Sequence, residues 1–431
     1  MRYTGAQLIV RLLEQQGITT VAGIPGGAAL PLYDALGQSR IIRHVLARHE
    51  QGAGFMAQGM ARASGETAVC LASSGPGATN LVTAIADAKL DSIPLVCITG
   101  QVSSAMIGTD AFQEVDTYGM SIPITKHNYL VRDISELPHV IPAAFRIAQS
   151  GRPGPVWIDI PKDVQLAQID LDTLPAPGVA DEPCPVDLSA IAQAADMINR
   201  AARPVLYLGG GIVSSEAHQQ AIQLAEQAGL PTTMTLMALG TMPVDHPLSL
   251  GMLGMHAARS TNLIMQQADL LIVLGARFDD RAIGKAEQFC PDASIIHIDI
   301  DPSELGKIRR PHLAMNADIK QVLTHLLPLI EAQARSVWRT TVSDMQREFP
   351  FNQPNSDNPL CHYGLIRAAA EALDDDSIIT TDVGGTGLSV APTAAMADFR
   401  RAGNDGIRLA CGDWCRVSQT TGQSGLFFRR W

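Results

Sequence analysis

The sequence has few aromatic residues, few charged residues and no long apolar run. Phe, Trp and Tyr make up 5% of the 431 residues, and Asp, Glu, Lys and Arg make up 17%. A transmembrane helix needs roughly 18 or more consecutive apolar residues, and no such stretch occurs. No basic run occurs either, and a formal charge of −11 would repel a phosphate backbone. We therefore expect neither a membrane nor nucleic acid as a partner.

Cysteine usage indicates a reducing compartment. The seven cysteines are an odd number and include no Cys-x-x-Cys pair, which argues against a disulfide framework and against a zinc site. Near the N-terminus, apolar residues at helical spacing from Leu8 to Leu13 are interrupted by Arg11 and Glu14. This pattern predicts an amphipathic helix rather than a signal peptide. The expected location is the cytoplasm.

The chain has enough apolar material for sizeable cores. Hydrophobic residues make up 46% of it, which excludes a disordered protein, and its length suggests about three domains. Short apolar runs alternate with amphipathic segments over residues 1–165 and again over 187–345. This alternation predicts α/β domains with mostly parallel sheets covered on both faces. Residues 166–186 lose the pattern and are expected to be a linker, and 346–384 to be a second linker with the start of a third unit.

Two glycine-rich turns each follow a predicted strand and precede a helix. They are Gly23-Ile24-Pro25-Gly26-Gly27 and the segment from Gly75 to Asn80. Such turns let the backbone approach a ligand and present N–H groups at a helix N-terminus, although a plain tight turn has the same composition. Gly209-Gly210-Gly211 comes nearest to a dinucleotide fingerprint but lacks its third glycine.

Several charged residues stand where a strand ends or a helix begins. Glu50 is either a carboxylate favoured by the helix dipole or a buried carboxylate acting on a cofactor nitrogen. The segment from Arg277 to Arg281 directly follows an apolar strand, where open α/β sheets bind ligands; the alternative is a solvated charge cluster. Asp299 ends the next strand and is placed to accept a hydrogen bond from a ribose hydroxyl.

The combination of motifs is far more specific than any one of them. They are, in chain order, Gly-Ile-Pro-Gly-Gly, Arg-His-Glu-Gln-Gly-Ala, Ser-Gly-Pro-Gly-Ala-Thr-Asn, Asp-Ala-Phe-Gln-Glu, Ser-Gly-Arg-Pro-Gly-Pro-Val, Asp-Ile-Pro-Lys-Asp, Gly-Met-Leu-Gly-Met-His and Arg-Phe-Asp-Asp-Arg. Residues 1 to about 384 resemble the catalytic large subunit of acetohydroxyacid synthase, also called acetolactate synthase, of the bacterial biosynthetic type. The resemblance implies tandem three-layer domains of the thiamine-diphosphate enzyme type: a pyrimidine-binding domain over 1–165, a central FAD-binding domain over 187–345 and the start of a pyrophosphate-binding domain within 346–384.

The resemblance implies a transferase of branched-chain amino acid biosynthesis. Such an enzyme decarboxylates pyruvate and transfers the two-carbon unit to a second 2-keto acid, pyruvate or 2-ketobutyrate, on the way to valine, leucine and isoleucine. Its cofactors are thiamine diphosphate, Mg²⁺ and FAD, and the FAD is structural. The family also implies a homo-oligomer, dimer or higher, with a small regulatory subunit.

The family's motifs carry residue roles onto this chain. Glu50 matches the carboxylate that hydrogen-bonds the thiamine aminopyrimidine, and Gly26 and Gly27 match the substrate side of the thiazolium. Phe112 and Gln113 match the loop that closes the site across a dimer partner. The substrate-channel residues are Lys162, Met255 and Arg281. The FAD-binding positions are Arg152, Gly209, Gly210, Gly211, Thr235, Leu236, Met237, Gly254, Met255, His256, Gly275, Arg277, Asp279, Asp299 and Asp318.

The resemblance stops after Gly384. Dropping a single base from permissible codons for Gly403 to Cys415 gives Gly-Thr-Met-Gly-Phe-Gly-Leu-Pro-Ala-Ala-Ile-Gly, which is a family motif. We therefore expect residues 385–431 to be an out-of-frame, disordered tail and the third domain to be essentially missing. It follows that this chain is expected to be inactive, holding FAD but neither thiamine diphosphate nor Mg²⁺, and no residue is assigned as a metal ligand.

Two other functions remain open at this point. The chain is alternatively a non-catalytic FAD-binding module that associates with other subunits. Another alternative is a different thiamine-diphosphate enzyme, such as pyruvate oxidase or a 2-keto acid decarboxylase. The segments from Asp110 to Glu114 and from Arg277 to Arg281 speak against that last interpretation.

Overall fold

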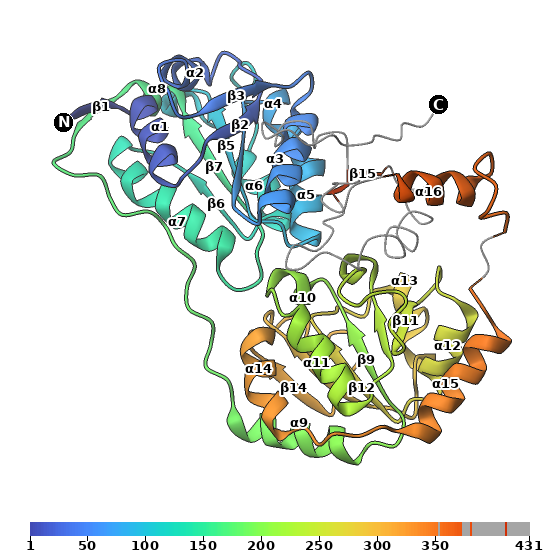
Figure 1. Cartoon of the computed structure of the whole chain (residues 1–431). Helices are drawn as coiled ribbons and strands as arrows, with labels where there is room; N and C mark the ends of the chain where they lie inside the picture. The colour runs from blue at the N-terminus through green and yellow to red at the C-terminus, as the bar shows by residue number, and fades with distance from the viewer. Residues whose placement is uncertain (352–353, 373–379, 382–409, 412–431) are drawn as a thin grey trace. The chain divides into compact units, whose positions relative to one another are not determined.

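The computed structural model describes residues 1–351, 354–372, 380–381 and 410–411. These residues belong to two compact units that divide between Glu182 and Pro183, called unit 1 and unit 2 below. Both units have a parallel sheet with helices on both faces, as the alternation of apolar runs predicts (Figure 1). Of the tail predicted over 385–431, all but Ala410 and Cys411 lies outside the described residues.

Unit 1 contains a six-stranded sheet in the order β3-β2-β4-β5-β7-β6, and every neighbouring pair is parallel. Its strands are β2 (Thr20–Gly23), β3 (Arg43–Leu46), β4 (Ala68–Ala72), β5 (Leu95–Gln101), β6 (His127–Leu130) and β7 (Pro155–Pro161). Its helices are α1 (Gly5–Gln15), α2 (Leu30–Leu36), α3 (Glu50–Ser64), α4 (Pro76–Thr79), α5 (Val82–Leu90), α6 (Thr117–Ser121), α7 (Leu137–Gln149) and α8 (Lys162–Leu166).

Alternate side chains of the central strands of unit 1 build two cores. Val69 and Leu71 of β4 pack with α1 and α7, whereas Cys70 packs with α3 and α5. Both faces of the strand are therefore buried, which explains why β4 reads as a continuous apolar run. The layers on either side of the sheet are visible in Figure 1.

The segment expected to be a linker, residues 166–186, begins with a short strand. β8 (Gln168–Asp170) pairs antiparallel with β1 (Arg2–Thr4), so both lie in a separate two-stranded sheet of unit 1. The N-terminal ammonium donates to the Leu171 carbonyl at 2.6 Å and extends this pairing.

Unit 2 has a second six-stranded parallel sheet, in the order β11-β10-β9-β12-β13-β14. Its strands are β9 (Pro204–Leu208), β10 (Thr232–Met234), β11 (Ser249–Met252), β12 (Leu270–Leu274), β13 (Ser294–Asp299) and β14 (Leu313–Asn316). Its helices are α9 (Leu188–Arg200), α10 (Gly211–Ser214), α11 (His218–Ala228), α12 (Arg259–Gln266), α13 (Asp280–Ile283), α14 (Ile319–Leu326), α15 (Ser336–Glu348) and α16 (His362–Glu371).

Helices cover both faces of the second sheet as well. Side chains of α9, α11 and α14 share one core with alternate residues of β9 and β12, and those of α12 and α15 share the other. Trp338 of α15 donates its indole N–H to the carbonyl of Pro204, the first residue of β9, at 3.1 Å. Two further strands of two residues each, β15 (Thr380–Thr381) and β16 (Ala410–Cys411), are described.

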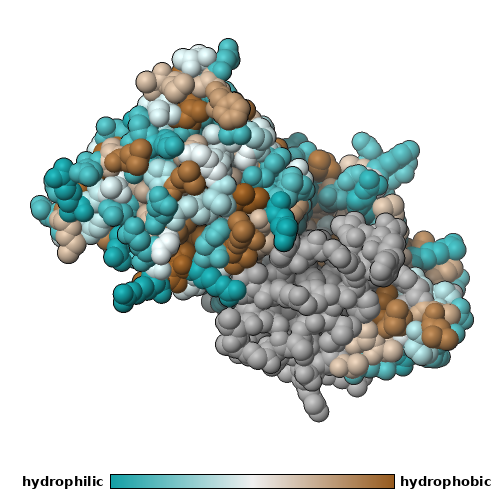
Figure 2. Space-filling model, turned by 90° about the horizontal axis from the view of Figure 1, so that it is seen from above, coloured by the Kyte–Doolittle hydropathy of each residue, from teal (hydrophilic) through white to brown (hydrophobic). Residues whose placement is uncertain are grey.

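Within the described ranges, no helix is both long enough and apolar enough to cross a bilayer. On the face shown in Figure 2, the hydrophobic side chains lie in separate small groups among hydrophilic ones.

Candidate functional site

In unit 1 the predicted site residues gather where parallel strands reach their carboxyl ends. Glu50 is the first residue of α3, and it is half-buried. The Nδ1 atom of His49 caps the helix by accepting from the Gln51 N–H at 3.1 Å. The side chain of Asn80 donates to Glu50 Oε2 at 2.9 Å and thereby fixes the carboxylate beside the second glycine-rich turn. This leaves Glu50 Oε1 near Gly77, where an added Cβ would lie 3.6 Å away.

The first glycine-rich turn packs against the second one. A Cβ on Gly26 would lie 2.5 Å from Ser73 Cβ, whereas a Cβ on Gly27 would meet nothing within 4 Å. The hydroxyl of Ser73 accepts from the Ala28 N–H at 3.3 Å. Gly26 is therefore required for packing against Ser73, which precedes the second glycine-rich turn, while the Cβ position of Gly27 is open.

Tyr33 is a neighbour of this site that the sequence did not single out. Its hydroxyl is buried and has no hydrogen-bond partner among the described residues. Burial is the main cause that raises the pKa of Tyr33, and the nearby Cys70 and Glu50 raise it further. Its ring packs edge-on against His44 at 4.9 Å between centroids, and burial lowers the pKa of that histidine. Nothing in the local sequence distinguishes Tyr33 from an ordinary core tyrosine.

The loop carrying Phe112 and Gln113 contacts the second glycine-rich turn. A Cβ on Gly75 would lie 2.6 Å from the Gln113 carbonyl oxygen, and both residues have positive φ, 56° and 60°. Glu114 braces the loop by accepting from the Ala111 N–H at 3.0 Å and from the Gly108 N–H. These backbone donors lower the pKa of Glu114. Phe112 is 88% exposed.

Lys162 lies at the same edge of the sheet, and Arg152 lies at the other. Lys162 begins α8 directly after β7 and is half-buried. From the same helix, Gln165 donates to the Ala28 carbonyl at 2.8 Å, which ties α8 to the first glycine-rich turn. Arg152 precedes β7 and donates to the Ser92 hydroxyl at 2.8 Å, before the start of β5. The structure therefore separates Arg152 from Glu50 within unit 1.

In unit 2 the predicted glycines meet at the carboxyl ends of β9 and β12. A Cβ on Gly209 would lie 2.1 Å from the Gly275 carbonyl oxygen, and one on Gly211 would lie 2.7 Å from Gly275 Cα. The Gly211 N–H donates to the Gly275 carbonyl at 3.1 Å. Gly275 itself has a φ of 59°, a conformation that favours glycine. These contacts leave no room for side chains on either strand end.

Residues from β10 and α14 border the same glycines. A Cβ on Gly210 would lie 3.2 Å from Met237 Cβ, and Ile319 Cδ1 approaches the Cβ position of Gly275 to 2.8 Å. Asp318 caps α14 by accepting from the Gln321 N–H at 2.9 Å. Leu236 and Met237 are both 41% exposed.

A second group of predicted residues forms around Gly254. The Met255 N–H donates to the Arg281 carbonyl at 2.9 Å, and Gly254 has a φ of 92° with Arg281 and Ala282 against its Cβ position. Asp279 caps α13 by accepting from the Arg281 N–H at 2.8 Å. The side chains of Met255 and Arg281 are mostly exposed, at 60% and 74%. His256 follows and is also exposed.

The strand ends at Arg277 and Asp299 surround a buried histidine that the sequence did not predict. His297 is fully buried, with Nε2 2.9 Å from the Ala276 carbonyl and its ring edge-on to Phe278. Burial lowers the pKa of His297, so the ring is neutral near pH 7. Arg277 is half-buried, and Asp299 Oδ1 accepts from the Asp301 N–H at 2.9 Å.

The residues of unit 2 fit a dinucleotide such as FAD. The glycines at Gly209 to Gly211 and at Gly275 let two backbone segments meet, and glycines at such strand ends let a dinucleotide approach the backbone closely. The hydroxyl of Thr235, at the end of β10, is buried and has no hydrogen-bond partner among the described residues, as expected for a group that binds a ligand. In unit 1, a half-buried Glu50 that is held by Asn80 beside Gly77 fits the aminopyrimidine of thiamine diphosphate. Within the described ranges, no three His, Cys, Asp or Glu side chains are grouped as a metal site requires.

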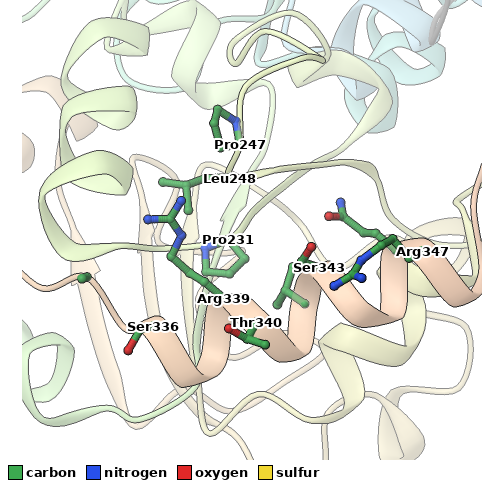
Figure 3. Close-up of a pocket in the computed structure, with 11 residues that line it drawn as sticks. Pro231, Pro247, Leu248, Ser336, Arg339, Thr340, Ser343 and Arg347 are labelled. Atoms are coloured by element: carbon green, nitrogen blue, oxygen red, sulfur yellow. The ribbon is translucent and has the colours of Figure 1, made fainter.

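A surface groove of unit 2 lies at the opposite edge of the sheet from these glycines. It runs between α15 and the residues that precede β10 and β11, including Pro231 and Pro247 (Figure 3). Arg339 and Arg347 of α15 border it together with several hydroxyl side chains. The groove includes none of the predicted site residues.

Two family models match this chain, and they match different units. Residues 3–120 match the N-terminal TPP-binding domain of thiamine pyrophosphate enzymes, and residues 191–326 match the central domain of the same enzymes. The first match includes Glu50 and both glycine-rich turns of unit 1, and the second includes the glycines of unit 2.

The chain is also similar to several acetolactate synthases. It is 68% identical over 383 residues to the acetolactate synthase isozyme 1 large subunit of Escherichia coli (strain K12), covering 89% of this chain and 68% of the relative. It is 46% identical to the acetolactate synthase large subunit of Corynebacterium glutamicum, covering 89% of this chain and 62% of that protein. The probable acetolactate synthase large subunit of Methanocaldococcus jannaschii is 43% identical, with 88% and 66% covered. The chain thus spans about two thirds of the length of these relatives.

Proposed function

This chain belongs to the acetolactate synthase large subunits, a family of thiamine pyrophosphate enzymes, and we propose that its two units serve the synthesis of acetolactate from pyruvate. The cofactors of this family are thiamine diphosphate, Mg²⁺ and FAD. The observation that carries the proposal is the position of Glu50, which the Asn80 amide fixes beside Gly77 of the second glycine-rich turn, at the carboxyl edge of the unit 1 sheet.

Glu50 is proposed as the carboxylate that activates thiamine diphosphate. When bound, thiamine diphosphate supplies a carbon nucleophile and accepts the electron pair released by decarboxylation of a 2-keto acid. The part of Glu50 is to hold a proton at Oε1, because Oε2 already accepts from Asn80. Sharing a proton with an aminopyrimidine nitrogen favours the imino tautomer, which is the form that acts as an internal base. The half-buried setting strengthens that hydrogen bond relative to water.

Other residues of the proposal hold the substrate. Lys162 of unit 1 and Arg281 of unit 2 are cations of the kind that bind a keto-acid carboxylate. Met255 is an exposed apolar neighbour of Arg281. Gly26 and Gly27 give access to the reacting carbon. Phe112 and Gln113 close the site, with the exposed ring of Phe112 contacting a partner subunit. Pyruvate is the first substrate, and pyruvate or 2-ketobutyrate is the acceptor.

Unit 2 is proposed to hold FAD. Gly209 to Gly211 and Gly275 would bind its diphosphate, and Asp299 and the Thr235 hydroxyl would bind its polar groups. Arg277 is a half-buried cation beside them. The other positions of unit 2 in this proposal are Leu236, Met237, Gly254, Met255, His256, Asp279 and Asp318. Arg152 of unit 1 is also proposed as an FAD-binding residue.

The assembly around these units belongs to the same proposal. We assign residues 1–165 to pyrimidine binding and 187–345 to FAD binding, with 346–384 leading towards a pyrophosphate-binding domain. The relatives named above are large subunits, which supports a small regulatory subunit as partner, and we propose a homo-oligomer of the large subunit. A cytoplasmic location is proposed because the related bacterial proteins are biosynthetic enzymes.

The test is Glu50→Gln, with Glu66→Gln as a matched control because Glu66 is exposed on the same unit. Acetolactate formation from pyruvate is measured with all three cofactors, both in the chain as given and in a chain whose residues after Gly384 are restored to the family reading frame. Gln keeps the shape of Glu50 but does not share a proton, so turnover should fall about 10²- to 10⁴-fold. Near-normal turnover of Glu50→Gln would overturn the proposed role.

A second function, a flavin-binding module without catalysis, is favoured by one observation. The glycines that meet at β9 and β12 and the unpartnered Thr235 hydroxyl belong to unit 2 alone. FAD bound by the chain as given, with no acetolactate formed, would support this description of that chain.

A further inference from the structure

Asp159 of unit 1 is a buried carboxyl group to which the proposed chemistry gives no role. It is 2% exposed and lies in β7, next to Thr99 of β5 in the sheet register. Burial raises the pKa of Asp159 to about 7, although hydrogen bonds from Thr99, Gln101 and Thr117 counteract this rise. Burial of a carboxyl group in the core lowers the free energy of unfolding unless hydrogen bonds compensate for it, so the partners of Asp159 indicate what the group does.

The two oxygens of Asp159 have different partners. Thr99 donates to Oδ1 at 2.6 Å, and the hydroxyl of Thr99 in turn accepts from the Trp157 indole at 2.8 Å. Gln101 donates to Oδ2 at 2.9 Å. The first oxygen thus binds groups within the sheet, and the second binds the last residue of β5, where the loop begins.

Gln101 connects this carboxyl group to the far end of the loop. Its Nε2 atom also donates to the Val115 carbonyl at 3.0 Å, and its Oε1 accepts from the Val102 N–H at 2.8 Å. Both hydrogens of the amide and its oxygen are therefore used, and the orientation of the amide is fixed by the acceptor at Asp159. At the start of the loop, Asp163 accepts from the Ser104 N–H at 2.9 Å.

We propose that Asp159 is a positioning residue, which acts through Gln101 to hold the loop of residues 102–116 and so keeps Gln113 against the turn at Gly75. The contact between the Gln113 backbone and Gly75 is close, and the same turn leads to Asn80, the partner of Glu50. The effect of Asp159 on turnover rests on the proposed function, in which Phe112 and Gln113 close the site. The effect on the loop rests only on the contacts above.

The isosteric change Asp159→Asn tests this role. Asn has a single acceptor oxygen, so its amide nitrogen would face either the Thr99 hydroxyl or the Nε2 atom of Gln101. The link to Gln101 is the one that is lost when the amide nitrogen faces it, because two N–H donors cannot share a hydrogen bond. Gln101→Met removes the same link from the other side while it keeps the length of the side chain. Thr99→Val is the matched control, because it removes an equally buried hydrogen bond of the same carboxyl group that does not lead to the loop.

The readout is amide hydrogen exchange of the full chain without cofactor or substrate, resolved to the peptides that contain Ser104, Ala111 and Thr117. Loss of one anchoring hydrogen bond should raise exchange in residues 102–116 about 5- to 10-fold in Asp159→Asn and in Gln101→Met. Thr99→Val should leave this loop at the unsubstituted rate. The double variant Asp159→Asn with Gln101→Met should exchange no faster than Asp159→Asn alone, which also weakens the hydrogen bond from Thr117.

The inference is overturned if the loop exchanges at the unsubstituted rate in Gln101→Met, if Thr99→Val loosens it equally, or if the two changes are additive. Should Asp159→Asn fail to fold, the comparison of Gln101→Met with Thr99→Val decides alone. Because the measurement needs no cofactor and no turnover, its failure leaves the role proposed for Glu50 untouched, and failure of that role leaves this measurement valid.

Discussion

The close contact between β9 and β12 makes Gly209→Ala a sensitive test of the proposed flavin site. The added Cβ would lie 2.1 Å from the Gly275 carbonyl oxygen and 2.6 Å from Ala276 Cα, both of them backbone atoms. Since van der Waals contact between carbon atoms needs about 3.5 Å, the two strand ends would have to separate by about 1 Å. That movement strains the Gly209 N–H bond to Leu274 and the Gly211 N–H bond to Gly275, at 2.9 and 3.1 Å.

The cost follows from these contacts. Overpacking costs about 1–3 kcal/mol, and each weakened hydrogen bond adds about 1 kcal/mol, so Gly209→Ala should destabilise unit 2 by about 2–5 kcal/mol. Gly210→Ala is the matched control, because its Cβ meets only a side-chain atom, Met237 Cβ at 3.2 Å, and its backbone is already helical. We expect Gly210→Ala to cost less than about 1 kcal/mol.

Urea-dependent hydrogen exchange on peptides of β9 and β12 gives the two free energies of unfolding, and FAD titration gives binding. Gly209→Ala should lose both stability and FAD binding, whereas Gly210→Ala should keep the fold. Equal stability of the two variants would refute the packing argument. Unchanged FAD affinity in a folded Gly209→Ala variant would refute the placement of the diphosphate.

Three further predictions concern unit 1. Gly26→Ala should destabilise it by about 1–3 kcal/mol, because Ser73 occupies the Cβ position. Gly27→Ala should unfold at the same urea concentration as the unsubstituted protein and weaken only cofactor binding. The reverse order of stability would contradict the assignment of open space to Gly27. Asn80→Ala should change the free energy of unfolding by less than about 1 kcal/mol but lower acetolactate formation, because Glu50 loses the donor that fixes it. Asn80→Gln should not restore the rate, because the longer amide displaces the carboxylate. The pKa of Asp159 is about 7 in the folded chain and near 3.8 in the unfolded chain, so the folded form binds the proton more tightly. The free energy of unfolding should therefore fall by about 4 kcal/mol in total as pH rises from about 4 to about 7. That fall should be missing from Asp159→Asn when the two proteins are compared by urea unfolding at each pH, and the same slope in both would contradict the assignment.

The central strands were predictable because both of their faces are buried. β4, β9 and β12 read as continuous apolar runs, and β7 does so except at Asp159; each of the four is buried over its whole length. The edge strand β6 (His127–Leu130) and the strand β14 (Leu313–Asn316) are short and partly exposed, so they leave no such run. For the same reason the sequence did not separate β8 from the linker.

The site was predictable where a motif fixes backbone geometry, and much less so where distant side chains meet. The glycine turns at Gly26 and Gly209 stand out in the sequence because a close contact occupies each Cβ position, with the Ser73 side chain at Gly26 and with the Gly275 backbone at Gly209. Tyr33, His297 and Asp159 were missed, because each lies in an apolar segment and only the fold shows its surroundings. In particular, the sequence does not reveal that Gln101 lies between Asp159 and Val115.

The role proposed for Glu50, activation of thiamine diphosphate, is tested most directly by the exchange rate of the C2 proton of the bound cofactor. This rate is followed by NMR in D₂O without pyruvate. The measurement is made on the chain restored to the family reading frame after Gly384, with Glu50→Gln compared with Glu66→Gln. If Glu50 activates the cofactor, Glu50→Gln should slow this exchange about 10²- to 10⁴-fold, while Glu66→Gln should leave it unchanged. Equal exchange rates in the two variants, with the cofactor bound in both, would contradict this role.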